Sequence, residues 1–393
     1  MDGPEPKRNS TSAAIAASLP LAPRLHGLSV FVAFSTLGLV AAGALVTSKG
    51  AGLAVPDWPR SYGHSLVSYV WWPEEFFSAE NIRAEHGHRT FAGFVGILTV
   101  ILTIAAWRSP GAGRAVRWIA TAALAAVLLQ ALLGGLTVRN LLPPELSVSH
   151  ALLAQIFFCL TVTIALLTSR GWRRGSRAGG SSRTRADAPD RATRALAVGL
   201  VALLFAQLFV GALSRHLSKD SGLALHEFPR SFQGAWAPPL DAESLGELNA
   251  ARRALGFPED VGAAAVALHF AHRVGAVAVT LFALIAGLRV LRRRRDRAEL
   301  LFPAMAIWLL LVLQIALGVA AVASFRQPHI TTAHVAVGAA TLGAAVVLCL
   351  QAFRLEAAEH GTHGIHEIEK TMKGDDGVDL ALTSGGRSRE VAT

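Results

Sequence analysis

Eight long apolar runs constrain this chain more than any other feature of its sequence. Each run is long enough to cross a bilayer, which takes about 20 residues of helix. The runs cover residues 28–46, 89–107, 117–138, 148–168, 195–214, 266–290, 302–323 and 331–353. Because lipid offers no hydrogen-bond partner to an open strand edge, such runs must be helical. The sequence therefore predicts an all-α integral membrane protein with eight transmembrane helices.

The composition and the placement of charge agree with this class. Only 16% of the 393 residues are charged, which is low for a soluble domain, and 52% are hydrophobic. The net charge of +10 could indicate nucleic acid or anionic lipid as a partner. Most arginines stand in short clusters beside the apolar runs, where they set topology. We therefore expect contact with membrane lipid and none with nucleic acid.

The arginine clusters also predict an orientation. They fill the links after the second, fourth and sixth runs, whereas the links after the third and seventh runs hold one arginine each, Arg139 and Arg326. By the positive-inside rule, both termini are then cytoplasmic and the protein is a multi-pass protein of the cell (inner) membrane. Two long loops, 47–86 and 215–265, would face the outer side.

Composition divides the chain into five parts. The stretch 169–194 is rich in arginine, glycine and serine and is expected to be a flexible cytoplasmic linker. It separates an N-terminal four-helix bundle, 28–168, from a C-terminal four-helix bundle, 195–353. A disordered cytoplasmic leader, 1–27, and a disordered cytoplasmic tail, 354–393, are expected at the two ends.

An internal repeat relates the two bundles. Residues 52–62 match residues 222–232, and each segment follows the first span of its half. Three further pairs are each separated by 184 positions: His88 and His272, Gln130 and Gln314, and His150 and His334. Because each half holds an even number of spans, both halves have the same orientation. The repeat predicts two pseudo-symmetric bundles related by an axis along the membrane normal.

Two histidines stand near the outer end of each bundle: His88 and His150 in the first, His272 and His334 in the second. Ionisable residues within membrane spans are costly and usually functional. A neutral histidine bonded to a neighbouring helix is the ordinary alternative, but four matched positions favour a ligand role. A structural zinc site uses four ligands and a catalytic one usually three. Two opposed imidazoles instead suit the axial positions of haem iron, so the sequence predicts one haem per bundle.

Residues beside the histidines are consistent with a binding site for a flat macrocycle, because they would leave room for it. The residue four positions after each histidine is small: Ala92, Ala154, Ala276 and Gly338. Arg89 and Arg273 directly follow a histidine and either pair with haem propionates or reach the lipid headgroups. Glu85 stands one turn before His88, where the second half has His269. A carboxylate there is a candidate proton acceptor, which makes the first half the reactive one.

These residues together resemble the haem A synthase (haem O oxidase) family over roughly 28–353. The resemblance rests on motifs in the order expected for the family: Gly52-Leu53-Ala54-Val55-Pro56-Asp57-Trp58-Pro59, Glu85-x-x-His88-Arg89, Leu133-Gly134-Gly135-Leu136-Thr137-Val138, His150, His269-x-x-His272-Arg273 and His334. It implies an oxidoreductase that converts the C8 methyl group of haem O into a formyl group. The product would be haem A for cytochrome oxidase.

The resemblance also implies how the two halves divide this work. The C-terminal half would hold a haem b cofactor on His272 and His334, with Arg273 as a binding residue. The N-terminal half would hold the substrate haem on His88 and His150, with Arg89 as a binding residue. The important glutamate of the family falls on Glu85. Haem O is too apolar to diffuse freely, so a complex with the haem O synthase is a further expectation, and a homo-oligomer is left open.

One departure and two alternatives stay open at this point. Many family members carry two cysteines in the first outer loop, and Val55 and Ser61 stand there in this chain. Thiol-linked electron delivery is therefore in doubt. The chain could instead be a di-haem b electron-transfer subunit, or a haem-handling protein without chemistry. Two haems on the same outer side argue against transfer across the membrane, and Glu85 has no role in either alternative.

Overall fold

The structure is a computed structural model that describes residues 21–65, 68, 79–177, 191–218, 224–238 and 240–374. Helices account for most of these residues, and the part of the chain described has no strand beyond two isolated bridges. The helices are α2 (Leu21–Ser48), α4 (Glu80–Arg108), α5 (Arg114–Arg139), α6 (Pro144–Thr168), α7 (Arg170–Arg177), α8 (Arg191–Leu217), α9 (Ala242–Ala254), α10 (Ala263–Arg294), α11 (Ala298–Ala323) and α12 (Pro328–Gly374).

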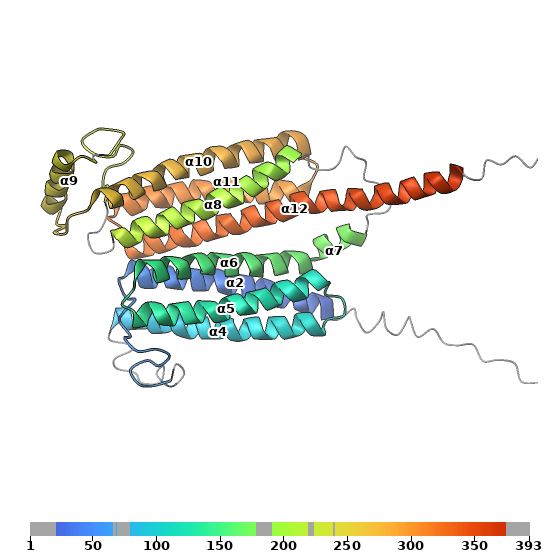
Figure 1. Ribbon diagram of the computed structural model, residues 1–393, viewed down its shortest axis with the longest axis horizontal. Coiled ribbons are helices and arrows are strands. Elements are labelled where there is room, and N and C mark those ends of the chain that lie inside the picture. Colours follow the sequence, from blue (N-terminus) through green and yellow to red (C-terminus); the bar gives the residue numbers. More distant parts are fainter. Residues whose placement is uncertain are drawn as a thin grey trace, which may run out of the picture.

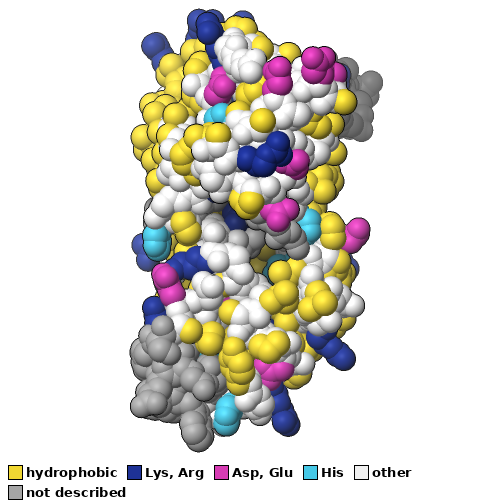
Figure 2. Space-filling model, turned by 90° about the vertical axis from the view of Figure 1, so that its left-hand side faces the viewer, with side chains coloured by type: hydrophobic (Ala, Val, Ile, Leu, Met, Phe, Trp, Pro, Cys, Tyr) yellow, Lys and Arg dark blue, Asp and Glu magenta, His cyan; other side chains and the backbone are white. Residues whose placement is uncertain are grey.

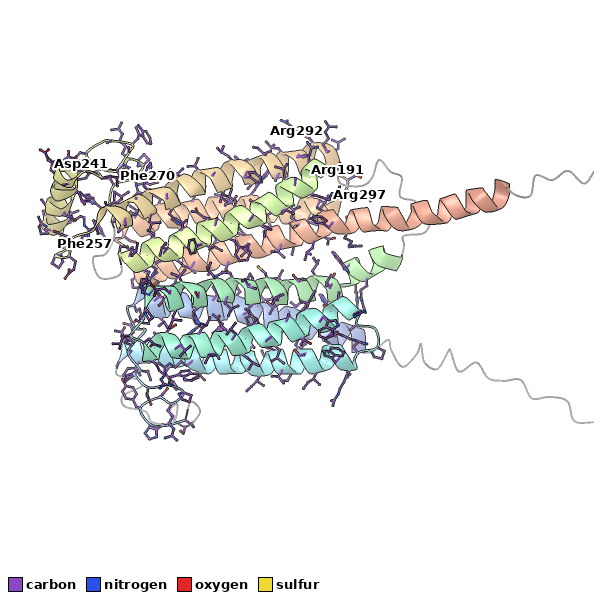
Figure 3. All side chains as sticks on the ribbon, in the orientation of Figure 1. Arg191, Asp241, Phe257, Phe270, Arg292 and Arg297 are labelled. Atoms are coloured by element: carbon purple, nitrogen blue, oxygen red, sulfur yellow. The ribbon has the colours of Figure 1, made fainter. Side chains whose placement is uncertain are left out.

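Figure 1 shows the eight long helices as two groups of four that lie side by side. The first group holds α2, α4, α5 and α6, and the second holds α8, α10, α11 and α12. Between the groups, α12 packs against α2 and α6, and α6 also packs against α8. The loops that follow α2 and α8 lie together at one end of the molecule, which we call the loop end. The opposite end, where Arg191, Arg292 and Arg297 lie (Figure 3), we call the arginine end.

All eight long helices are long and apolar enough to cross a membrane. Each predicted run falls inside one of them, so the prediction of eight transmembrane helices is confirmed. The side chains that point away from the bundles are largely apolar, as a lipid-facing surface requires: Leu309 and Phe302 are each 72% exposed. The interior of each bundle is a separate cluster of buried aliphatic residues.

The backbone conformation of one turn is also the same in the two groups of helices. The turns that close α5 and α11 each hold two successive non-glycine residues with positive φ: Leu141 and Leu142, and Phe325 and Arg326. In each turn, the second of these donates its N–H to a carbonyl five residues earlier, at 2.8 Å in both cases. These short turns let antiparallel neighbours pack closely. Two pseudo-symmetric bundles are consistent with this arrangement.

The helices extend further than the apolar runs suggested. We expected a disordered tail from 354, but α12 continues to Gly374 and projects beyond the bundle at the arginine end (Figure 1). The added residues contain four glutamates, which favour helix, and no proline, so the helix continues past Gly361 and Gly364. Part of the expected linker, 170–177, also forms a helix, α7, and α2 begins at Leu21 within the expected leader. Residues 1–20, 178–190 and 375–393 lie outside the described part.

The second loop contains a helix that the sequence analysis did not predict. In α9, the side chain of Asp241 caps the first turn by accepting the N–H of Ser244 at 2.9 Å. Leu248 of α9 packs into a small core with Leu225 and Val266, which joins the loop to the start of α10. Figure 2 views this loop end, where charged, histidine and hydrophobic side chains are mixed.

Candidate functional site

The second bundle brings His272 of α10 and His334 of α12 together. Both helices pack against α8 and α11, so they lie diagonally across the bundle. The two imidazole rings face each other with their centres 6.4 Å apart and their planes at 72°. Two imidazoles on one metal ion have ring centres about 6 Å apart, because each metal–nitrogen bond is about 2 Å. The spacing therefore fits a single iron atom between the two rings.

The first bundle repeats this arrangement. His88 lies on α4 and His150 on α6, and these helices both pack against α2 and α5. The two rings are close enough to interact electrostatically. Within the described residues, no three His, Cys, Asp or Glu side chains form a metal-binding group. Two imidazoles per bundle suit an iron that a porphyrin already holds by four nitrogens.

A glycine of a neighbouring helix lies against each of the four rings. A Cβ atom added to these glycines would come close to the Cε1 atom of the ring: 3.0 Å from Gly43 to His88, 3.1 Å from Gly134 to His150, 2.8 Å from Gly211 to His272 and 3.2 Å from Gly318 to His334. The glycines lie on α2, α5, α8 and α11, which are the helices without the histidines. Each imidazole therefore packs against a helix backbone at a position that has no side chain, which we call its glycine seat. Gly134 and Gly318 have the same separation of 184 positions as the histidine pairs, whereas Gly43 and Gly211 lie outside the repeat that the sequence analysis found.

The Nδ1 atoms of the four rings have different surroundings. The amide nitrogen of Gln207 donates to the carbonyl oxygen of His272 at 2.8 Å and lies 3.0 Å from its Nδ1. The Nδ1 atoms of His88, His150 and His334 are buried and have no hydrogen-bond partner. Buried polar atoms without partners are rare and usually have a functional reason. The missing partners argue against a purely structural role for these three histidines.

Two glutamines complete the surroundings of the rings. Gln130 donates to the carbonyl oxygen of His150 at 2.8 Å. Its repeat partner Gln314 instead contacts the Nε2 atom of His334 at 3.3 Å. An iron ligated by that Nε2 would displace this contact, so Gln314 must move when such a site fills.

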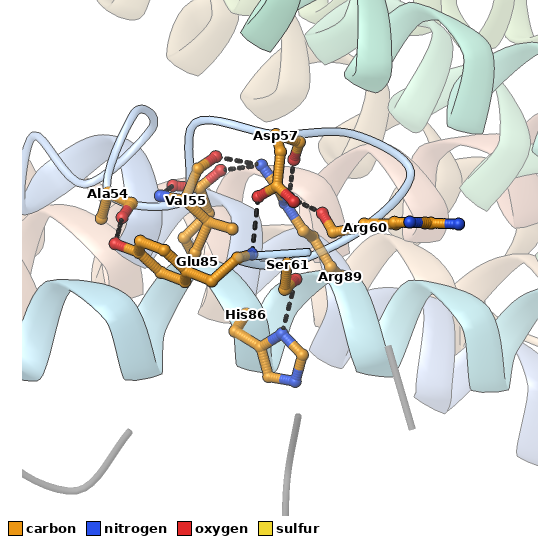
Figure 4. Close-up of polar contacts among 9 residues, drawn as sticks. Ala54, Val55, Asp57, Arg60, Ser61, Glu85, His86 and Arg89 are labelled. Atoms are coloured by element: carbon orange, nitrogen blue, oxygen red, sulfur yellow. Dashed lines mark hydrogen bonds and ion pairs between the residues drawn. The ribbon is translucent and has the colours of Figure 1, made fainter. Parts of the chain in front are cut away.

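Glu85 lies one turn nearer the loop end than His88 and is 3% exposed. Figure 4 shows its contacts. One carboxylate oxygen accepts the backbone N–H of Val55 at 2.8 Å, and the other pairs with Arg89. Arg89 also donates to the carbonyl oxygens of Val55 at 2.7 Å and Asp57 at 2.6 Å. The loop after α2 is therefore tied to α4 through this buried ion pair.

The second half builds the same junction with a histidine. Leu225, the repeat partner of Val55, donates its N–H to Nδ1 of His269 at 3.1 Å. Arg273 donates to the carbonyl oxygens of Leu225 at 3.0 Å and Arg230 at 3.2 Å. The exchange of Glu85 for His269 thus keeps the backbone contact and removes the negative charge. Because Arg89 and Arg273 both bind loop carbonyls, their predicted pairing with propionates stays a prediction that needs these bonds to change.

Each loop is also closed on itself by a carboxylate. Asp57 accepts the N–H groups of Tyr62 at 2.7 Å and Gly63 at 2.9 Å. Partial burial would raise the pKa of Asp57, but these two N–H groups and the charge of Arg89 lower it below its ordinary value. In the second loop, Glu227 accepts the matching N–H groups of Gln233 and Gly234.

The two positions without the expected cysteines are both buried. Val55 and Ser61 are each 0% exposed, and the hydroxyl of Ser61 lies 3.0 Å from Nδ1 of His86. The contact between Ser61 and His86 therefore joins the loop to α4. The two cysteines of this chain, Cys159 and Cys349, are free and lie within the bundles.

Comparison with known proteins places these features in a wider group. The family model of the COX15-CtaA cytochrome oxidase assembly proteins matches residues 26–346. The chain is 26% identical over 216 residues to the Heme A synthase of Bacillus licheniformis, 30% over 138 residues to that of Brucella anthropi and 30% over 216 residues to that of Bacillus pumilus. These matches cover 54%, 34% and 52% of this chain and 66%, 38% and 62% of the respective relatives.

Proposed function

Because the chain belongs to the COX15-CtaA family of cytochrome oxidase assembly proteins, we propose that it is a haem A synthase. It oxidises the C8 methyl group of haem O to a formyl group and so makes haem A for a cytochrome oxidase. The observation that carries this proposal is the unequal pair of bundles. Both have facing histidines, but only the first has a buried carboxylate, Glu85, one turn away.

The two bundles then have different tasks. His272 and His334 would hold a resident haem b through its iron, and their 6.4 Å ring spacing suits that role. When bound, haem b would supply one-electron chemistry that passes the electrons of the substrate to an oxidant outside this chain. His88 and His150 hold the substrate, haem O, in the first bundle. Both substrate ligands lie on helices, His88 on α4 and His150 on α6, and not on loops, which keeps the reacting methyl group in one place.

Glu85 is the proposed catalytic base. If both His88 and His150 ligate the substrate iron, that iron has no free position for dioxygen. Water is then the better oxygen source: each hydroxylation of the methyl carbon adds one water and releases two electrons and two protons. Glu85 accepts a proton from the attacking water. After two such steps, the gem-diol loses water to give the formyl group.

The contacts of Glu85 bear on this role. Arg89 and the N–H of Val55 bind its two oxygens and fix the orientation of the carboxylate. Each carboxylate oxygen has more than one lone pair, so a water can still be bound. The junction therefore orients the carboxylate while leaving it able to accept a proton.

The experiment that tests the function is pigment analysis after co-expression with a haem O supply. Haem extracted from membranes and separated by chromatography should contain haem A in addition to haem b. Only haem b would support an electron-transfer subunit, and unchanged haem O would support a haem-handling protein. Growth in ¹⁸O-labelled water tests the oxygen source: a label that arrives only from dioxygen would contradict the mechanism, provided exchange of the aldehyde oxygen is controlled.

Sidedness and partners form part of the same proposal. The arginine end faces the cytoplasm of a cell (inner) membrane, with both termini on that side, as the positive-inside rule indicates. The loop end and both histidine pairs then lie near the outer surface. Because haem O is strongly apolar, a complex with the haem O synthase would deliver it directly, and a homo-oligomer of this chain is compatible with the lipid-facing surfaces.

A further inference from the structure

Two arginines of the second bundle, Arg215 and Arg326, lie nearer the loop end than the glycines that contact His272 and His334. The ring of His272 rests on Gly211 of α8, and Arg215 stands four residues later on the same face. Arg215 is thus one turn nearer the loop end than the ring. The ring of His334 rests on Gly318 of α11, and Arg326 follows in the turn that ends this helix.

Neither guanidinium is used in the junctions described above. The Nη1 atom of Arg215 lies 3.3 Å from the hydroxyl of Ser48, which is a neutral group at the end of α2. The Nη1 atom of Arg326 donates to the carbonyl oxygen of Ser218 at 3.0 Å. The two guanidiniums are near enough to repel each other, and both are partly buried. Two like charges held together in this way are stabilised by an anion between them.

The first bundle has no cation at either matching position. On α2, Thr47 stands four residues after Gly43 and bonds the carbonyl oxygen of that glycine at 3.0 Å. In the turn after α5, the matching residue is Leu142, whose side chain packs on the backbone of Gly52. Arg89 and Arg273 occur in both halves, so they do not account for the difference. A pair of arginines at these two matched positions occurs only in the second bundle, because Lys49 and Arg139 of the first bundle stand at positions that do not match Arg215 and Arg326.

We infer that Arg215 and Arg326 form an anion subsite that binds the propionate carboxylates of the tetrapyrrole held between His272 and His334. This inference rests on the proposed function. The porphyrin contributes two carboxylates at one edge, and a guanidinium binds a carboxylate through two parallel hydrogen bonds. The subsite retains the resident haem in the second bundle. The first bundle lacks it because its haem arrives as substrate and must leave as product.

The test compares haem with a haem that lacks propionate charge. Full-length protein carrying His88→Ala and His150→Ala, which leaves only the second site, is produced without haem and titrated with protohaem or with its dimethyl ester. The Soret absorbance reports binding. Arg215→Thr and Arg326→Leu copy the residues of the first bundle. Each should weaken binding of protohaem roughly tenfold and binding of the dimethyl ester less than twofold.

Two controls separate charge from structure. Arg215→Lys keeps the charge and should retain most of the preference for protohaem. Arg253→Thr removes the same charge from an exposed ion pair with Asp260 on α9 and should change neither affinity. Equal weakening for both ligands, or no weakening in either variant, would overturn the subsite while leaving the proposed function intact. A parent protein that binds neither ligand would overturn the proposed function, and the subsite with it.

Discussion

The two bundles share a backbone plan and differ in a few polar side chains. Each seats two imidazoles on glycines and ties its outer loop to the second helix through an arginine. The first bundle then adds a buried carboxylate, Glu85, and the second replaces it with His269. The second bundle alone adds Gln207 beside a ligand histidine and Arg215 above it. Under the proposed function, side chains around the matched histidines divide a duplicated frame into a reactive half and a retaining half.

Removing the axial pairs is the strongest way to break this comparison. His272→Ala with His334→Ala should abolish haem b binding, because the iron loses both protein ligands. His88→Ala with His150→Ala should abolish haem A formation but leave haem b at its normal ratio to protein. Reduced-minus-oxidised absorption spectra and extracted pigments measure both results. If the second double variant also loses haem b, the two bundles are not independent sites.

Exchanging the residues that differ at the junction should affect turnover only. Glu85→His copies the second half and should lower haem A formation by about 10²–10⁴-fold, which is the usual contribution of a general base. Haem b content should not change. His269→Glu is the matched control, since it places a carboxylate in the half that carries no substrate, and it should keep most of the activity. Turnover of Glu85→His within twofold of the parent would rule out the catalytic assignment.

The glycine seats offer a smaller test of the shared frame. Gly211→Ala would place a methyl group 2.8 Å from the ring of His272, so the ring or α8 must shift, which typically costs about 1–3 kcal/mol. Haem b should bind more weakly. Gly43→Ala should do the same for the substrate haem, with haem b unchanged.

Gly93→Ala is the control for these seats, because a methyl group there meets no atom within 4 Å. Alanine also favours helix over glycine, so this variant should be at least as stable as the parent. The three glycine variants are compared by their haem content and by the temperature at which each loses its haem. Equal haem loss from Gly93→Ala would show that the effect does not depend on the ring contact.

The sequence predicted the features that depend on local pattern. Hydrophobic runs located all eight spanning helices, and the constant separation of His88 from His272 and of His150 from His334 located the two matched histidine pairs. It did not predict where the helices end, because backbone hydrogen bonds continue through polar residues once the chain has left the apolar region. The extension of α12 to Gly374 is the clearest case.

Features that depend on contacts distant in sequence were missed. Gln207 stands 65 positions before His272, and only the packing of α8 against α10 brings them together. Arg89 was expected to pair with a haem propionate or to reach the lipid headgroups, but in the structure it binds its i,i+4 partner Glu85 and the loop carbonyls. Aligning α2 with α8 would have paired Gly43 with Gly211 and Thr47 with Arg215, which was the unused signal.

The outer loops give the smallest and most local difference between the halves. The N–H groups of Tyr62 and Gly63 bind Asp57, and they favour its charged form, so the pKa of Asp57 lies below its ordinary value. A lowered pKa means that these hydrogen bonds to Asp57 are present at neutral pH and are lost as pH falls through the lowered value.

Hydrogen exchange followed by mass spectrometry, corrected for the intrinsic pH dependence of exchange, tests this. The peptide that contains these amides should be protected at pH 7 and should lose that protection in acid. Asp57→Asn should lower the protection at pH 7 and remove its dependence on acid. The matching amide of Gly234 lies 3.4 Å from Glu227, a longer contact, and should be less protected in the parent. Equal protection in both loops, unchanged by Asp57→Asn, would mean that packing and not the carboxylate holds them.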